Sequence, residues 1–211
     1  MDNFVITIAR GYGSGGRQIG KKLAEELGIR MIDRELLQMA SSESGISEEL
    51  FALADEKLKK KAPFGGAVRK YTGEILRPED QEFISDENLF NYQARVLVFL
   101  ACKESFIAIG RAADYVLRDF PNVLSVNIQA PYEDCVRSIT KRFMMSDREA
   151  EKAVKNIDKY RAGYYKYYTG KDWKDPANYD ICLNSSRLGR EKCVNVIKAC
   201  AGLKFSHLAI G

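Results

Sequence analysis

Histidine is nearly absent from this sequence, which contains only His207 among its 211 residues. Cysteine occurs five times, but no two cysteines form a Cys-x-x-Cys pair. Because structural zinc sites need several closely spaced cysteines and histidines, this composition argues against a zinc protein. We expect reduced thiols that act as small apolar side chains, as is usual inside cells.

Long apolar runs are also missing. No segment approaches the roughly 20 residues that span a bilayer, and the N-terminus lacks the basic and apolar regions of a signal peptide. The net charge of +4 suits an anionic small molecule but is too weak to indicate a nucleic-acid-binding protein. We therefore expect a cytoplasmic protein with no membrane or nucleic-acid partner, and its oligomeric state stays open.

Short β-branched runs alternate with helical patterns along most of the chain. Strands are predicted at residues 4–9, 29–32, 105–109, 123–128 and 179–183. This alternation predicts an α/β fold with a parallel five-stranded sheet and helices on both faces. In such sheets ligands bind at the carboxyl ends of the strands.

Residues 34–104 interrupt this alternation and are predicted to form a mainly helical insertion within a single domain, 1–211, whose core is 1–33 and 105–211. Ser47 is predicted to cap one helix and Asp86 another. Apolar spacing predicts that the first of these helices buries Leu50, Leu53, Ala54 and Leu58. Residues 146–149 form a capping box that predicts a further helix start.

A glycine-rich turn follows the first predicted strand. Glycines stand at positions 11, 13, 15 and 16, immediately before a helical pattern. Glycines let the backbone approach a phosphate closely, and the helix N-terminus adds partial positive charge. A phosphate-binding turn is therefore favoured over a purely structural one.

Two kinds of phosphate-binding turn fit this segment. In a P-loop, Gly11 and Gly16 occupy the glycine positions, with Arg17 in place of the lysine and Gln18 in place of the hydroxyl residue. In a dinucleotide fingerprint, Asp33 at the end of the second strand would bind a ribose. The turn alone leaves both a kinase and an oxidoreductase open.

The second half of the chain is rich in arginine and tyrosine. Asp158 and Arg161 lie three positions apart, on one face of a predicted helix. Phosphoryl transfer depends on positive groups that position phosphates and neutralise developing charge, so this composition favours a kinase over an oxidoreductase. A solvated basic helix is the alternative interpretation.

Several separated segments resemble the cytidylate kinase-like family, over nearly the whole chain from Phe4 to about Cys200. They are residues 8–19, 33–37, 109–114, 129–131, 158–165 and 178–184. The resemblance implies a P-loop nucleoside-monophosphate kinase with an acceptor-binding insertion and a basic lid near residues 142–160. It also implies transfer of a phosphoryl group from ATP to CMP or dCMP with Mg²⁺.

The resemblance further implies roles for individual residues. The ATP phosphates would be held by Gly11, Gly13, Ser14, Gly15, Gly16, Arg17 and Gln18. The acceptor would be held by Asp33, Arg34, Arg111, Asp158 and Arg161. Catalysis would fall to Arg17, Arg111 and Arg161, with Asp33 orienting Mg²⁺ or the acceptor phosphate, while Arg142 and Arg148 belong to the lid.

Some positions differ from true cytidylate kinases. Arg17 and Gln18 replace the usual P-loop lysine and hydroxyl residue, and Ala112 replaces the aspartate that follows the glycine-arginine pair. The sequence identifies no set of metal ligands. These differences keep a nucleotide-binding regulator without turnover open as an alternative, beside the dinucleotide oxidoreductase.

Overall fold

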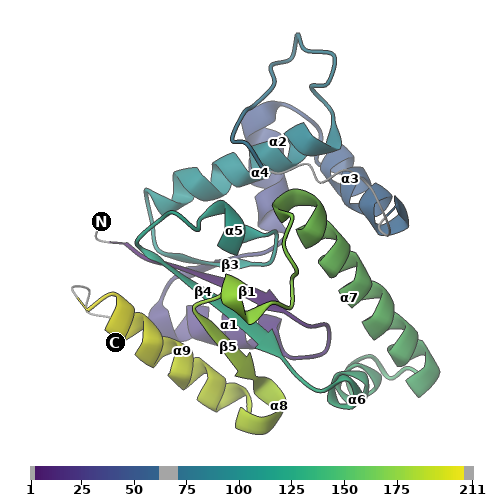
Figure 1. Ribbon diagram of the computed structural model, residues 1–211, viewed down its shortest axis with the longest axis vertical. Helices are drawn as coiled ribbons and strands as arrows, with labels where there is room; N and C mark the ends of the chain where they lie inside the picture. The colour runs from purple at the N-terminus through teal and green to yellow at the C-terminus, as the bar shows by residue number, and fades with distance from the viewer. Residues whose placement is uncertain (1–2, 62–70, 207–211) are drawn as a thin grey trace.

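Figure 1 shows the computed structural model of the chain, which describes residues 3–61 and 71–206. Its centre is a five-stranded sheet in the order β2-β3-β1-β4-β5, and every pair of neighbouring strands is parallel. The strands are β1 (Val5–Arg10), β2 (Arg30–Ile32), β3 (Phe106–Ile109), β4 (Val123–Gln129) and β5 (Ile181–Asn184). The predicted parallel five-stranded sheet is confirmed. His207 and the side chain of Leu58 lie outside the described part.

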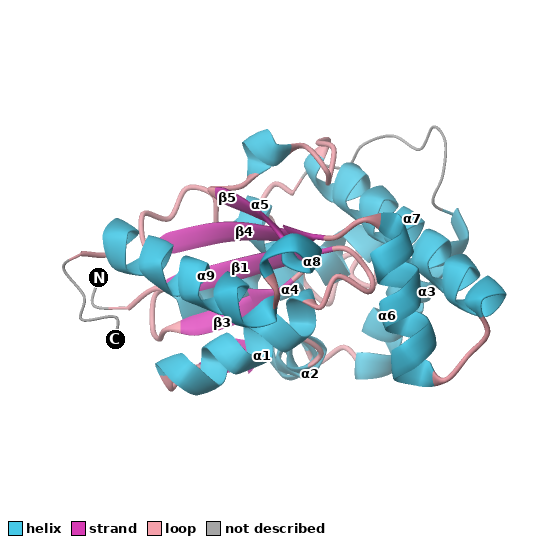
Figure 2. Ribbon diagram, turned by 90° about the horizontal axis from the view of Figure 1, so that it is seen from below, coloured by secondary structure: helices cyan, strands magenta, loops and turns pink. Residues whose placement is uncertain are grey.

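Helices cover both faces of the sheet, as Figure 2 shows. Because side chains alternate along a strand, Ile6 and Ile8 of β1 pack with α1 (Gly16–Leu27) and α9 (Arg190–Lys204). Val5 and Ala9 belong to the opposite cluster, with α4 (Asp86–Ala101) and α5 (Ala113–Val116). β1 is therefore buried on both faces, and only its ends are available to a ligand.

The helical insertion consists of α2 (Glu35–Ser44), α3 (Glu48–Lys61) and α4. The predicted inward face of α3 is partly wrong, since Leu53 is 53% exposed whereas Phe51 is fully buried. Contacts of α3 with α2, α4 and α7 select a face that includes Phe51 and Ala54. The predicted cap of α4 is also wrong by one residue, because the Ser85 side chain accepts the hydrogen bond from the Asn88 amide.

Two helices follow β4, namely α6 (Tyr132–Phe143) and α7 (Asp147–Thr169). The capping box predicted at the start of α7 is confirmed, with both Ser146 and Glu149 bonds present. α7 runs without a break past residue 160, the predicted end of the lid, and Figure 1 shows it beside the carboxyl ends of the strands. The chain then continues through the 3-10 turn η1 (Pro176–Asn178), β5 and α8 (Ser185–Leu188).

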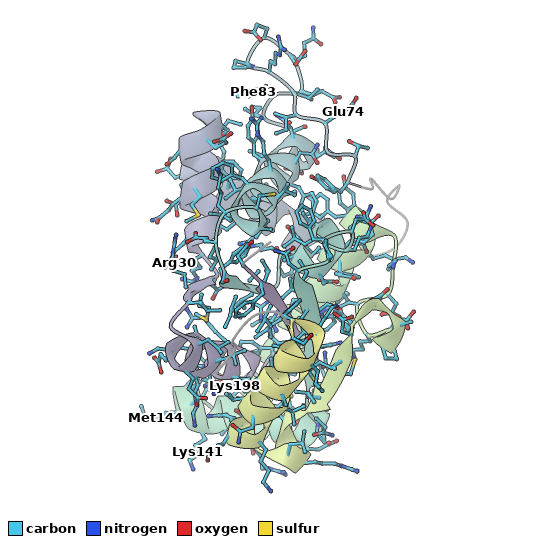
Figure 3. All side chains as sticks on the ribbon, turned by 90° about the vertical axis from the view of Figure 1, so that its left-hand side faces the viewer. Arg30, Glu74, Phe83, Lys141, Met144 and Lys198 are labelled. Carbon is cyan, nitrogen blue, oxygen red and sulfur yellow. The ribbon has the colours of Figure 1, made fainter. Side chains whose placement is uncertain are left out.

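The insertion and the segment predicted as a lid extend in opposite directions along the molecule. Figure 3 shows Glu74 and Phe83 of the insertion toward one end, and Lys141 and Met144 of the α6–α7 segment toward the other. The carboxyl ends of the central strands lie between these two parts. Within the described ranges, no helix is both long enough and apolar enough to cross a membrane.

Candidate functional site

The glycine turn between β1 and α1 adopts a conformation that requires glycine at two positions. Gly13 and Gly15 have φ angles of 92° and 81°, in the left-handed region. A Cβ atom on Gly13 would lie 2.6 Å from the carbonyl oxygen of Cys135 in α6. The turn is thus tightly packed against α6, with no room for a side chain at Gly13.

Ser14 holds the turn in shape from inside. Its hydroxyl donates to the Gly11 carbonyl at 2.8 Å and accepts from the Gly16 amide at 3.4 Å. The Ser185 hydroxyl, from the start of α8, donates to the Ser14 carbonyl at 2.6 Å. Because Ser14 is buried and bonded within the turn, its observed role is structural.

Four amides at this turn have no protein acceptor in the part of the chain that the structure describes. They belong to Gly13, Gly15, Arg17 and Gln18. The last two open α1, where unpaired N–H groups and the helix dipole favour an anion. The turn therefore offers the donors that phosphate oxygens need.

Arg17 lies in the first turn of α1 and is directed to the end of β2. Its Nε donates to Oδ2 of Asp33 at 2.6 Å, and the Arg17 side chain is 53% exposed. This ion pair joins the start of α1 to the residue that follows β2. Gln18 is partly exposed beside the turn, with its Oε1 3.5 Å from the position a Cβ of Gly15 would take.

A strained turn follows β3. Gly110, Arg111 and Ala112 have φ angles of 71°, 59° and 50° in succession. For residues other than glycine, this conformation costs about 1–2 kcal/mol each. Strain of this kind concentrates at ligand-binding sites, and here it directs the chain so that Arg111 lines the cavity described below.

α7 is docked on the glycine turn through two charged side chains. Asp158 Oδ1 accepts from the Tyr12 amide at 2.8 Å, and Arg161 donates to the Arg10 carbonyl at 2.9 Å. The two side chains also pair with each other at 3.6 Å. Burial raises the pKa of Asp158 and lowers the pKa of Arg161, while their mutual attraction opposes both shifts.

A cavity of about 1100 Å³ opens at the carboxyl ends of β1, β2 and β3, between the insertion and α7. It contains more cationic than acidic side chains, and its α7 wall is aromatic. The cations are Arg10, Arg34, Arg111, Lys159 and Arg161; the acids are Asp33, Glu48 and Asp114; the aromatic residues are Tyr12, Tyr160, Tyr164, Tyr165 and Trp173. This combination suits a ligand with a phosphate and a planar ring.

The structure brings together most of the residues predicted for the acceptor. Asp33, Arg34, Arg111 and Arg161 line the cavity, and Asp158 lies at its edge through its bond to Tyr12. The two arginines predicted for the lid, Arg142 and Arg148, are exposed, and neither is among the described residues that line the cavity. Arg142 stacks over the ring of Phe143, 5.2 Å from its centroid.

Two residues of the site were missed by the sequence analysis. Arg10, the last residue of β1, lines the cavity, and burial together with nearby Arg161 lowers its pKa to about 9. Asp114 also lines the cavity and accepts from the Tyr165 hydroxyl at 2.6 Å, and burial raises its pKa to about 6. An arginine that ends an apolar strand just before a glycine turn was the available signal for Arg10.

The strand order distinguishes the two kinds of phosphate-binding turn. In a dinucleotide-binding sheet the first two strands are neighbours, so that an acid after β2 reaches the ribose. Here β3 lies between β1 and β2, and Asp33 is bound to Arg17. The oxidoreductase alternative does not fit this arrangement.

Comparisons with known proteins agree with this fold. The model of the cytidylate kinase-like family matches residues 5–187. The chain is 27% identical to the cytidylate kinase of Methanosarcina barkeri, over 92% of this chain and 93% of that protein. It is also 27% identical to the cytidylate kinase of Pyrococcus horikoshii, over 94% of this chain and 88% of that protein.

Solved structures share the fold at lower identity. An uncharacterized protein from Eubacterium ventriosum matches with a TM-score of 0.68 and 24% identity, covering 94% of this chain and 98% of that one. A shikimate kinase from Bacteroides thetaiotaomicron matches with a TM-score of 0.51 and 13% identity, covering 93% and 97%. The fold is that of P-loop kinases, and the chain belongs to the cytidylate kinase-like family.

Proposed function

We propose that this protein transfers the terminal phosphoryl group of ATP to a nucleoside monophosphate, with CMP or dCMP as the first acceptors to test. The observation that carries the proposal is the cavity of about 1100 Å³, in which arginines lie at the strand ends opposite an aromatic wall. A nucleoside monophosphate has a dianionic phosphate for the arginines and a planar base for the tyrosines. The relatives at 27% identity, both cytidylate kinases, make the cytosine nucleotides the natural starting point.

The proposed reaction needs no protein nucleophile. An oxygen of the acceptor phosphate forms a bond to the terminal phosphorus of ATP, and the bond from that phosphorus to the ADP oxygen breaks. In this proposal the free amides of Gly13 and Gly15 bind donor phosphates, while Arg111 and Arg161 hold the acceptor phosphate in line. Catalysis of this kind rests on positioning and on stabilising charge in a site that excludes water.

Mg²⁺ is the metal expected for such a reaction, where it neutralises the transferred phosphate. In the described ranges no group of three or more metal-ligating side chains is present. Kinase magnesium sites often use one or two carboxylates plus substrate phosphates, and Asp33 at the end of β2 fits that smaller requirement. Asp33 would then exchange part of its bond with Arg17 for the metal.

The division of the chain into a core, an acceptor-binding insertion at 34–104 and a lid near 142–160 belongs to this proposal. The insertion and α7 form opposite walls of the cavity, which supports separate acceptor-binding and closing roles. Arg142 and Arg148 would reach the phosphates only after the α6–α7 segment moves inward. ATP as donor and a cytoplasmic location are proposed on the same basis.

A coupled assay for ADP with ATP, Mg²⁺ and each common nucleoside monophosphate tests the function. We expect the highest kcat/KM with CMP or dCMP. ADP production with none of the monophosphates, together with tight ATP binding, would favour the regulator without turnover. That second candidate is supported by the Arg17–Asp33 ion pair, which engages the residue at the P-loop lysine position.

A further inference from the structure

Arg10 is a cation that lines the cavity, and in the described part of the chain no side chain forms a hydrogen bond or ion pair with its guanidinium. It ends the central strand β1, and its Cβ lies 2.5 Å from where a Cβ of Gly16 would stand. Its guanidinium reaches across to the Gly110 turn and occupies the space that a Cβ of Gly110 would take. Glycines on both sides thus make room for this one side chain.

The surroundings of Arg10 are cationic. Arg161, Arg111 and Arg17 all disfavour its charge, whereas Asp33 is the carboxylate that favours it. Asp33 is already bonded to Arg17 at 2.6 Å. Within residues 3–61 and 71–206, the Arg10 guanidinium has no hydrogen bond or ion pair, although it carries five N–H donors.

A partly buried guanidinium surrounded by other arginines is unfavourable in the empty protein. The backbone nevertheless maintains this arrangement at a structural cost, since Arg111 and Ala112 adopt left-handed angles beside it. A dianion in the cavity would remove the repulsion and accept hydrogen bonds from the guanidinium. The oxygens of a phosphate match such a fork of donors, and a phosphate monoester supplies the two negative charges.

We propose that Arg10 is a phosphate-binding residue, which holds a phosphate group of the nucleotide between the glycine turn and the Gly110–Ala112 turn. From the end of β1 it adds a positive charge to that of Arg17 at the start of α1. The identity of the nucleotide rests on the proposed function, but phosphate binding itself does not. The phosphate belongs either to the acceptor or to the end of the donor.

The binding test uses inorganic phosphate and the full chain, in the wild type, Arg10→Gln and Arg30→Gln. Arg30 is the control, because it is an exposed arginine of β2, labelled in Figure 3, which pairs with Glu104 at 3.1 Å and does not line the cavity. By calorimetric titration we expect Arg10→Gln to weaken phosphate binding about tenfold or more, and Arg30→Gln to change it less than about twofold. Equal affinities of Arg10→Gln and the wild type would overturn the proposal.

A second measurement separates binding from a structural role. Without phosphate, we expect the thermal midpoint of Arg10→Gln to equal or exceed that of the wild type, because the substitution removes repulsion. With phosphate, the wild type should gain more in thermal midpoint than the variant. A variant that is less stable without phosphate and gains as much from it would instead mark Arg10 as a structural residue and overturn the proposal.

A third measurement does not depend on how the glutamine variant folds. Arg10→Lys keeps a charge at the site and identifies the Arg10 Nε–H resonance in NMR spectra by its disappearance. In the wild type that resonance should shift on titration with inorganic phosphate, with the same apparent Kd as the calorimetry. A resonance that does not move at saturating phosphate would overturn the proposal.

Competition then tells which nucleotide supplies the phosphate. Displacement of inorganic phosphate by CMP alone assigns Arg10 to the acceptor, and displacement by ATP alone assigns it to the donor. Either result supports the proposal, whereas simultaneous binding of phosphate and both nucleotides overturns it. If no monophosphate is ever phosphorylated but Arg10-dependent phosphate binding persists, the proposed function fails while this inference stands.

Discussion

The packing of the glycine turn against α6 predicts unequal effects of two glycine-to-alanine substitutions. Gly13 and Gly28 both have positive φ angles, 92° and 64°. A Cβ on Gly28 would meet no atom within 4 Å, whereas a Cβ on Gly13 would lie 2.6 Å from the Cys135 carbonyl oxygen and 2.9 Å from its Cα. The pair therefore separates backbone strain from steric conflict.

Gly28→Ala should lower the free energy of unfolding by about 1–2 kcal/mol, the cost of a left-handed alanine. Gly13→Ala bears that cost and a further ~1–3 kcal/mol, because backbone atoms of α6 must move to admit the methyl group. Alanine reduces the entropy of the unfolded chain equally at both sites, so this effect cancels in the comparison. The expected total for Gly13→Ala is about 2–5 kcal/mol.

Urea unfolding followed by circular dichroism measures both values, provided that the m-values match that of the wild type. The ADP assay should also show reduced turnover for Gly13→Ala, since the turn and α6 shift together, and unchanged turnover for Gly28→Ala. Losses of unfolding free energy that agree within about 0.5 kcal/mol would refute the reasoning. They would mean that the turn yields to the methyl group without cost.

Three further predictions concern individual side chains. Arg17→Ala should reduce kcat about a hundredfold or more, as loss of a charge-stabilising group typically does, and an unchanged kcat in the ADP assay would remove Arg17 from the mechanism. Arg161→Ala should mainly raise the KM for the acceptor, because Arg161 lines the cavity from α7; an effect on the KM for ATP alone would contradict this assignment. Asp114→Asn should remove a pH dependence of stability. Burial raises the pKa of Asp114 from its ordinary 3.8 to about 6, so between these pH values the native state binds a proton that the unfolded state has lost. The free energy of unfolding of the wild type therefore falls as pH rises through this range, by about 3 kcal/mol in total. Urea midpoints of the variant that decline between pH 4 and 6 as steeply as those of the wild type would show that another group is responsible.

The fold was largely predictable because its signals are local. Short apolar runs marked all five strands, two of them followed directly by a glycine, and the capping box at Ser146 marked the start of α7. The error in α3 arose because two faces of the helix were nearly equal in apolar character. In α3 both Phe51 and Leu53 are apolar, and only the contacts with neighbouring helices bury the first and expose the second.

The candidate site was predictable only in part. Glycines and the arginines of matched motifs can be recognised one segment at a time, so Arg111 and Arg161 were found before the structure was known. Arg10 and Asp114 were missed, although Arg10 directly precedes the glycine turn and Asp114 ends the matched segment 109–114. Their importance appears only when β1, the Gly110 turn and α7 meet at one end of the sheet.

The sequence by itself determined an alternating α/β chain with a phosphate-binding turn after its first strand. The spacing of apolar residues, the residue types in turns and the glycine content are all properties of short segments. The tertiary structure alone decided the strand order, which separates β1 from β2 and removes the dinucleotide interpretation. It alone placed Arg17 on Asp33 and left Arg10 facing a cationic cavity. Such charge relations depend on distances between segments far apart in the chain, and no local pattern encodes them.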